Sequence, residues 1–188
     1  VKLINDFFTN KLSNNILKQY GKVKFISITN VYAHINNIKN FNKGLLKIMD
    51  EDSVLMIEFP YIIDMIDKNL YDLIYHEHLS YLSIYPLNKL FKKQGFKIIN
   101  LKKVQIGASG PALQVYITLK KSKQVVSKNV PNQILYEKKW GINKLQKYKN
   151  FEKKVTRNKI KLINLLNRLN TNNKIGGFSA PAKGNTLL

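Results

Sequence analysis

The sequence contains no cysteine, and lysine supplies nearly all of its positive charge, because only Arg157 and Arg168 are arginines. The lack of cysteine excludes disulfides and thiolate metal sites within these 188 residues and is typical of a reducing compartment. Long apolar runs are absent as well, since Lys, Asn or Asp interrupts each run well before the roughly 20 residues that a membrane-spanning helix needs. No signal peptide is visible. These absences predict a soluble, cytoplasmic protein that does not bind a membrane.

Negative charge is also scarce, because 11 acidic residues face 32 basic ones and leave a formal net charge of +21. Such a surplus ordinarily points to nucleic acid or an anionic membrane as a partner. Here the surplus is lysine spread from end to end, and arginine, the preferred bidentate contact to phosphate and guanine, is nearly missing. A general bias toward Lys, Asn and Ile codons produces the same composition. We interpret the charge as such a bias combined with an anionic small-molecule substrate, and a basic nucleic-acid-binding module is the alternative.

Core-forming residues are abundant. Hydrophobic residues make up 44% of the chain, with nine Phe and ten Tyr, which is enough for a substantial core in one domain or slightly more. The chain begins at Val1 rather than at Met and stops directly after a Gly-rich turn, where another element is expected to start. We therefore expect it to be a fragment of a longer protein.

Helices and strands alternate in the predicted secondary structure. Thr9 can cap a first helix that Gly21 ends, and Pro86 suits the first turn of a later one. The expected elements are helices over 10–20, 38–49, 86–95 and 145–169, and strands over 23–29, 53–59, 96–104, 113–119 and 174–178. The first two strands flank a helix and are therefore expected to be parallel, with ligands beyond their carboxyl ends, where 30–34 and 58–61 lie.

The later strands predict an antiparallel hairpin across the turn at 107–111. Glycine in this turn is explained most simply by hairpin chemistry, and a ligand-facing loop is the alternative. The predicted fold is thus α/β, a doubly wound sheet with an antiparallel edge. A polar stretch over 120–131 and the long amphipathic helix then lead to a second domain.

Two of the three histidines stand in residues 74–81 (IYHEHLSY), and the third, His34, ends the polar segment NVYAH. Imidazole, carboxylate and phenol together suit proton transfer near neutral pH. A metal site would need further ligands that are scarce here, and Ser80 stands where a zincin helix (His-Glu-x-x-His) has its second histidine. A purely structural polar cluster is the other alternative. We favour acid-base catalysis.

The carboxyl-terminal residues 176–186 (GGFSAPAKGNT) follow a predicted strand, and their small side chains allow backbone amides to approach an anion. This is not a Walker A loop, because Lys183 precedes Gly184 instead of following a glycine and leading into Ser or Thr. A generic turn is one interpretation, and contact with a phosphate or sugar is the one we favour.

Four segments together resemble the S-adenosylmethionine-dependent C-methyltransferases that act on nucleotide-linked keto-deoxysugars. They are 30–34 (NVYAH), 57–61 (IEFPY), 71–81 (YDLIYHEHLSY) and 180–188 (APAKGNTLL). The resemblance runs over nearly the whole chain in the right order, and the YHEH and PAKGNT segments are specific to the family.

The resemblance implies three parts, of which this chain holds pieces of two. Residues 1–120 would be the C-terminal part of a Rossmann-like methyltransferase domain, 121–140 a linker, and 141–188 a bridging helix with the start of a second Rossmann-like domain. The cofactor is expected to be S-adenosylmethionine. Its Gly-rich loop, and the cysteines of a structural zinc domain, would lie upstream of Val1, so no metal is expected in this chain.

The resemblance also implies roles for individual residues. His78 would be the base that removes a proton beside the substrate ketone, Glu77 would position an imidazole or contact the sugar, and no role follows for His76. The remaining candidates are Tyr75 and His34 as hydrogen-bond donors to the enolate, Asn30 as a cofactor contact, and Ser179, Lys183 and Asn185 as substrate contacts. The substrate would be a nucleotide-linked keto-sugar, and the alternative is another sugar-nucleotide enzyme, such as an epimerase or dehydratase.

Overall fold

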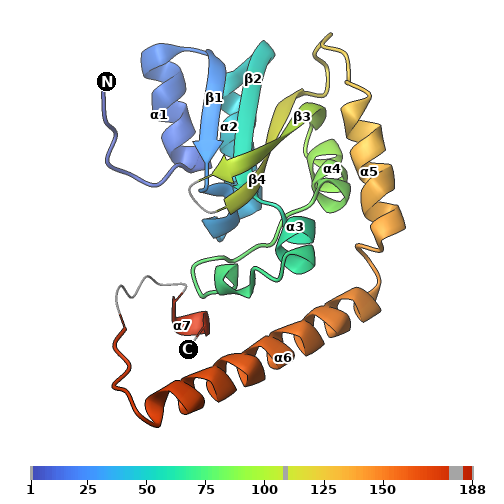
Figure 1. The fold of residues 1–188 in the computed structure, drawn as a ribbon. Coiled ribbons are helices and arrows are strands. Elements are labelled where there is room, and N and C mark those ends of the chain that lie inside the picture. The colour runs from blue at the N-terminus through green and yellow to red at the C-terminus, as the bar shows by residue number, and fades with distance from the viewer. Residues whose placement is uncertain (1, 108–109, 178–183, 188) are drawn as a thin grey trace.

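A computed structural model of the chain describes residues 2–107, 110–177 and 184–187 (Figure 1). Its elements in chain order are α1 (Asn10–Tyr20), β1 (Val23–Thr29), the 3-10 helix η1 (Tyr32–His34), α2 (Ile38–Ile48), β2 (Met49–Pro60), α3 (Ile62–Asp67), the 3-10 helix η2 (Tyr71–Leu73), α4 (Ile84–Lys93), β3 (Phe96–Gly107), β4 (Gly110–Leu119), α5 (Asn129–Trp140), α6 (Leu145–Asn170) and α7 (Gly184–Leu187). The helices and strands predicted before residue 120 are confirmed with small shifts of their ends, and α3, η1 and η2 are additional.

Short polar side chains start α1 and α2, as the sequence suggests for α1. The Thr9 hydroxyl accepts the Leu12 N–H at 3.1 Å, and the Asn37 side chain accepts the Asn40 N–H at 3.0 Å. These bonds satisfy N–H groups that have no partner within the helix. Gly21 ends α1 with a φ of 74°, which a residue with a side chain rarely adopts.

The four strands form one mixed sheet in the order β1-β2-β4-β3. β1 and β2 are parallel, whereas β4 pairs antiparallel with both β2 and β3. The predicted parallel pair and antiparallel hairpin are therefore confirmed. The expected antiparallel edge is wrong, because the antiparallel strand β4 lies between β2 and β3, and the edge strand β3 runs parallel to β1 and β2. Gly107 pairs with Gly110 at the hairpin, and the turn residues 108–109 lie outside the described residues.

One face of the sheet carries the hydrophobic core. Because side chains alternate along a strand, Leu55, Ile57 and Phe59 of β2 point to the same face, where they are fully buried in one cluster with Leu45 of α2 and Phe91 of α4. The opposite face is far more open, as the 60% exposure of Phe25 on β1 shows. The helices thus cover the sheet mainly on one side.

The predicted linker over 121–140 contains a helix, α5, which packs against α4 and β3. The polar composition concealed it, because its buried positions are few: Val130 and Glu137, seven residues apart on one side of the helix. The division of the chain into domains remains a prediction.

The predicted strand over 174–178 is wrong for residues 174–177, which adopt no strand conformation. Residue 178 lies outside the described residues. A strand is stabilised by pairing with a neighbour, and the described part of the chain offers these residues no partner strand. Two glycines, Gly176 and Gly177, further weaken any strand tendency.

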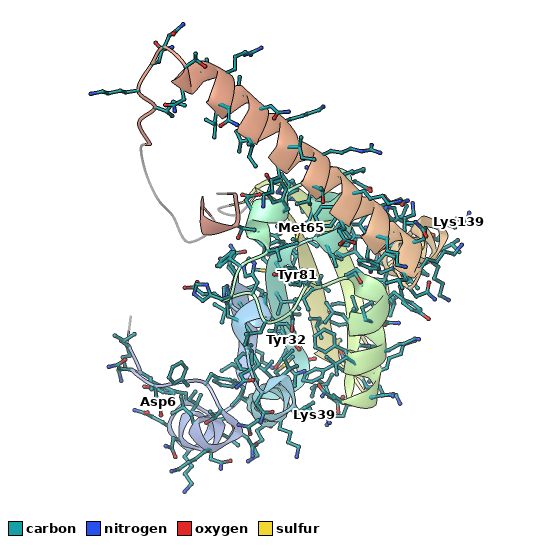
Figure 2. All side chains as sticks on the ribbon, turned by 90° about the horizontal axis from the view of Figure 1, so that it is seen from below. Asp6, Tyr32, Lys39, Met65, Tyr81 and Lys139 are labelled. Carbon is teal, nitrogen blue, oxygen red and sulfur yellow. The ribbon has the colours of Figure 1, made fainter. Side chains whose placement is uncertain are left out.

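The predicted long helix is confirmed as α6, which extends away from the sheet beside α3 (Figure 1). None of its residues is buried, and many of its side chains project into solvent (Figure 2). Two side chains of α6 donate hydrogen bonds to the body: Asn158 donates to the Tyr71 hydroxyl at 2.8 Å, and the Tyr148 hydroxyl donates to Ile142 O at 2.6 Å. Among the described residues, no helix has the length and apolar character needed to cross a membrane.

Tyr32 of η1 is fully buried and carries a polar group into the core (Figure 2). Its hydroxyl donates to Asn42 Oδ1 at 3.1 Å, and the Asn42 amide donates to Gln94 Oε1 at 2.5 Å. This network ties η1 to α2 and to the end of α4, and so holds the segment that ends in His34.

We expect Tyr32→Phe to lower the free energy of unfolding by about 1–3 kcal/mol, because it leaves buried Asn42 Oδ1 without its donor. Urea unfolding of the variant and of the unaltered chain measures this difference. Tyr20→Phe is the matched control, since Tyr20 is 45% exposed. Equal losses of unfolding free energy in both variants would contradict a stabilising role for the buried Tyr32–Asn42–Gln94 hydrogen bonds.

Candidate active site

The segment between β2 and α4, residues 62–83, folds over the carboxyl ends of β1 and β2. Its two ends meet, since Tyr61 forms a parallel bridge with Leu82 and the Ile62 N–H donates to Leu82 O at 3.3 Å. The Ser80 N–H donates to Ala33 O at 3.1 Å and so joins the segment to η1. The segment 30–34 and the histidine motif at 74–81 therefore lie side by side.

His34, Tyr75 and His78 form a compact group that we call the His–Tyr cluster. The ring centroids of His34 and His78 are 4.9 Å apart, and those of Tyr75 and His78 are 4.3 Å apart. All three side chains are partly exposed, so a substrate can reach them. The structure therefore brings together three of the four predicted catalytic residues.

Backbone carbonyls define the proton positions on both imidazoles. His78 Nδ1 lies 2.7 Å from Leu73 O, and His34 Nδ1 lies 2.7 Å from Glu77 O. A carbonyl oxygen only accepts, so each Nδ1 carries the proton, and each neutral ring has a proton-free Nε2. His78 Nε2 is 3.3 Å from the Tyr75 hydroxyl, which donates to it. In the neutral His78 ring, Nε2 is therefore the acceptor that faces the cluster.

Tyr75 keeps its proton at neutral pH. Burial raises the pKa of its hydroxyl, and the negative charge of Glu77 adds to that rise. Burial likewise raises the pKa of Tyr81, whose ring lies edge-on to His78 at 6.2 Å. The cluster therefore combines imidazole acceptors with a phenol, Tyr75, that remains a donor.

The acidic residue of the motif contacts an imidazole through its backbone. Glu77 holds His34 by its carbonyl oxygen, whereas its side chain is 55% exposed and lies 3.9 Å from His76 Nε2. The His76 side chain is itself 77% exposed. His76 thus stands outside the His–Tyr cluster, and a substrate contact of Glu77 remains a prediction.

Asn30 directly follows β1 in the left-handed region, with a φ of 55°. Its N–H donates to Glu58 O at 2.9 Å, but its buried Oδ1 has no hydrogen-bond partner among the described residues. Asn69 has the same two features, a φ of 57° and a buried Oδ1 without a partner among the described residues, so these features alone do not identify a ligand contact. This geometry is compatible with the predicted cofactor contact.

Two cavities flank residues 35–37. One, of about 500 Å³, is lined by His34 together with Phe7, Phe8 and Val31. Its size lies within the range of small-molecule sites, and it combines aromatic side chains with polar ones. It is the cavity that adjoins both the His–Tyr cluster and the residue after Asn30.

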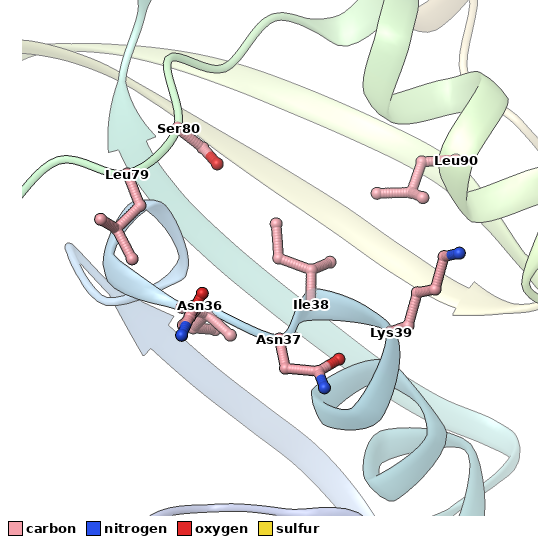
Figure 3. Close-up of a pocket in the computed structure, with 8 residues that line it drawn as sticks. Asn36, Asn37, Ile38, Lys39, Leu79, Ser80 and Leu90 are labelled. Carbon is pink, nitrogen blue, oxygen red and sulfur yellow. The ribbon is translucent and has the colours of Figure 1, made fainter.

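The second cavity, of about 600 Å³, lies between the start of α2 and α4. Figure 3 shows Leu79 and Ser80 on one side of it, with Leu90 of α4 across from Ile38. Ser80, which lines this cavity, also donates its N–H to Ala33 O of η1.

A family model described as a methyltransferase domain matches residues 2–101, which is more than half of the chain. The chain belongs to this methyltransferase family. A second family model, described as the C-methyltransferase C-terminal domain, matches residues 107–188. The predicted Rossmann-like fold and the prediction that the chain belongs to a methyltransferase family are confirmed. The narrower family of sugar C-methyltransferases remains a prediction.

The C-methyltransferase NovU of Streptomyces niveus is 25% identical to the chain over 189 residues, an alignment that covers 100% of this chain and 44% of NovU. The chain therefore spans less than half the length of this relative. Among solved structures, a SAM-dependent methyltransferase from Anabaena variabilis is 13% identical with a TM-score of 0.45, covering 63% of this chain and 58% of that one. The M1.HpyAVI–SAM complex is 10% identical with a TM-score of 0.34, covering 60% and 53%.

The carboxyl-terminal motif of this methyltransferase family member approaches the His–Tyr cluster through α7. The Thr186 hydroxyl donates to Ile74 O at 2.8 Å, directly before Tyr75. Ser179 and Lys183 lie outside the described residues, and of Asn185 only the backbone, in α7, is described. Their substrate contacts remain predictions.

The structure also contains a residue near the site that the sequence did not single out. Glu137 is fully buried beside Tyr61 and Ile84, the residues that flank the 62–83 segment. In the sequence it is marked only by its position, four residues before Gly141. Within the described ranges, no group of three His, Cys, Asp or Glu residues is arranged to hold a metal ion.

Proposed function

We propose that this chain is part of a C-methyltransferase that acts on a nucleotide-linked keto-deoxysugar with S-adenosylmethionine as the methyl donor. The observation that carries the proposal is the tautomer of His78, whose Nε2 is a proton acceptor within the His–Tyr cluster. The similarity to NovU along the whole chain supports a methyl transfer to carbon. The many lysines suit an anionic substrate such as a nucleotide sugar.

The residues around Asn30 fit the methyl donor. Asn30 offers a buried acceptor for which the described residues supply no donor, and the cavity of about 500 Å³ begins beside it at Val31 and His34. When bound, S-adenosylmethionine supplies an electrophilic methyl group. Asn30 and the cavity would hold S-adenosylmethionine, while the His–Tyr cluster would face the sugar.

His78 would prepare the carbon for methylation. Its Nε2 takes a proton from the carbon beside the ketone, the electrons of that C–H bond form the enolate double bond, and the ketone oxygen becomes an oxyanion. The Nδ1–H bond to Leu73 O orients the ring throughout and stabilises the imidazolium that results. His78 afterwards releases the proton to solvent.

Tyr75 is the better oxyanion donor of the two predicted residues. Its hydroxyl donates to His78 Nε2 in this structure. When the substrate C–H group occupies the position next to Nε2, the hydroxyl would turn and donate to the enolate oxygen. A donor held in place there stabilises the negative charge that develops on this oxygen. Neutral His34 has used its single N–H on Glu77 O, so it would donate only as an imidazolium. His34 therefore orients the cluster and becomes a donor only when charged.

A labelling experiment with the intact protein tests the proposal. In deuterated water and without the methyl donor, we expect a nucleotide-linked keto-deoxysugar to exchange the proton beside its ketone. Added S-adenosylmethionine should then increase the sugar mass by one methyl group on carbon. Exchange without any methyl gain would favour the epimerase alternative, and the absence of both would refute the proposal.

A further inference from the structure

Glu137 of α5 is a fully buried carboxylate with three hydrogen-bond donors around it. Its Oε1 accepts the Ile84 N–H at 2.8 Å and the Tyr61 hydroxyl at 2.9 Å, and its Oε2 accepts the Tyr85 N–H at 2.7 Å. Gln133, one turn earlier on α5, donates to the same Tyr61 hydroxyl at 2.7 Å. One side chain of α5 thus holds both the start of α4 and Tyr61, which stands between β2 and α3.

The helix α4 uses Glu137 in place of a local cap. Ile84 and Tyr85 are its first two residues, whose N–H groups have no acceptor within the helix, and Ser83 makes no side-chain capping bond. The positive end of the helix dipole also favours a carboxylate there. Burial raises the pKa of Glu137, and the bonds from Tyr85, Ile84 and Tyr61 act in the opposite direction.

The same carboxylate holds both ends of one segment. Tyr61 immediately precedes residues 62–83, and Ile84 immediately follows them. That segment contains Tyr75 and His78, and also the carbonyl of Leu73 that orients the base. A carboxylate bonded to Tyr61 and Ile84 closes the base of the segment, beside the weaker backbone contact of Ile62 with Leu82 at 3.3 Å.

We infer that Glu137 is a positioning residue, which closes the base of the 62–83 segment and thereby holds His78 against His34. For its effect on turnover, this inference rests on the proposed function. It assigns to α5 a part in building the site, although α5 contributes no side chain to the His–Tyr cluster.

Glu137→Gln tests the inference, because both oxygens accept a backbone N–H and an amide nitrogen must face one of these donors. We expect amide hydrogen exchange over residues 62–84 to accelerate about 10- to 100-fold, because the loss of a buried charged acceptor lowers the free energy of local opening. Exchange in β2 and β4 should stay unchanged. In the intact protein, kcat should fall while KM for S-adenosylmethionine is retained, since Asn30 lies outside the segment.

Thr118→Val is the matched control. Thr118 is fully buried and donates to Ser53 O at 2.9 Å, so its loss weakens the sheet away from the segment. It should lower stability without faster local exchange over 62–84 and without a change in kcat. If Glu137→Gln does not fold, Tyr61→Phe removes one donor and should give the same local pattern, more weakly.

Unchanged exchange over 62–84, or acceleration spread equally over β2 and β4, would overturn the inference. The exchange pattern needs no substrate. If the unaltered protein does not methylate keto-sugars, the proposed function fails, while the exchange result still decides the role of Glu137.

Discussion

Replacing His78 with glutamine is expected to lower turnover in methyl transfer by about 10²- to 10⁴-fold, the usual contribution of a general base. Glutamine can still donate to Leu73 O and so keeps this hydrogen bond, but it offers no basic nitrogen at the place of Nε2. Single-turnover assays of the intact protein measure the loss. Exchange of the substrate proton in deuterated water should disappear in parallel.

His76→Gln is the control for this substitution. His76 lies two residues away in the same motif, yet its side chain is 77% exposed and it stands outside the His–Tyr cluster. Its turnover should stay close to that of the unaltered protein. Near-normal turnover of His78→Gln, or an equal loss in both variants, would show that another group removes the proton.

Phe91→Ala is expected to lower the free energy of unfolding by about 3–5 kcal/mol, the typical cost of a large cavity in a packed core. Phe91 of α4 is fully buried and its ring contacts two aromatic neighbours, Tyr32 at 6.0 Å and Phe96 at 5.7 Å between centroids. Its loss therefore removes packing both under η1 and against β3. Urea unfolding followed by circular dichroism measures the change.

Phe25→Ala removes the same side chain from a different environment. Phe25 lies on the open face of the sheet and is 60% exposed, so little packing is lost. We expect Phe25→Ala to lower the free energy of unfolding by less than half as much as Phe91→Ala. Comparable losses at the two positions would mean that the core is not concentrated on the face covered by α2 and α4.

Much of the fold could be predicted because its signals are local. Thr9 and Gly21 marked the ends of α1, and short apolar runs marked the strands. The order of strand, helix and strand implied a parallel pair, and from that followed the meeting of 30–34 with the end of β2. The family motifs pointed to the same site, and the match over residues 2–101 places the chain in a methyltransferase family.

The errors have physical causes as well. The α5 helix buries few residues, one of them charged, so its pattern looked like a polar linker. The strand expected over 174–178 had suitable residues before its glycines but finds no partner among the described strands. Propensity alone does not supply a neighbour.

The sequence by itself determined which residue types stand at the strand ends, because capping, periodicity and motif spacing depend only on nearby residues. Only the tertiary structure decided their chemical states. The carbonyls of Leu73 and Glu77 determine which imidazole nitrogen carries a proton, and backbone carbonyls have no sequence signature. Glu137 becomes a buried acceptor only when α5 meets the start of α4, because burial and donor geometry arise from packing between distant segments.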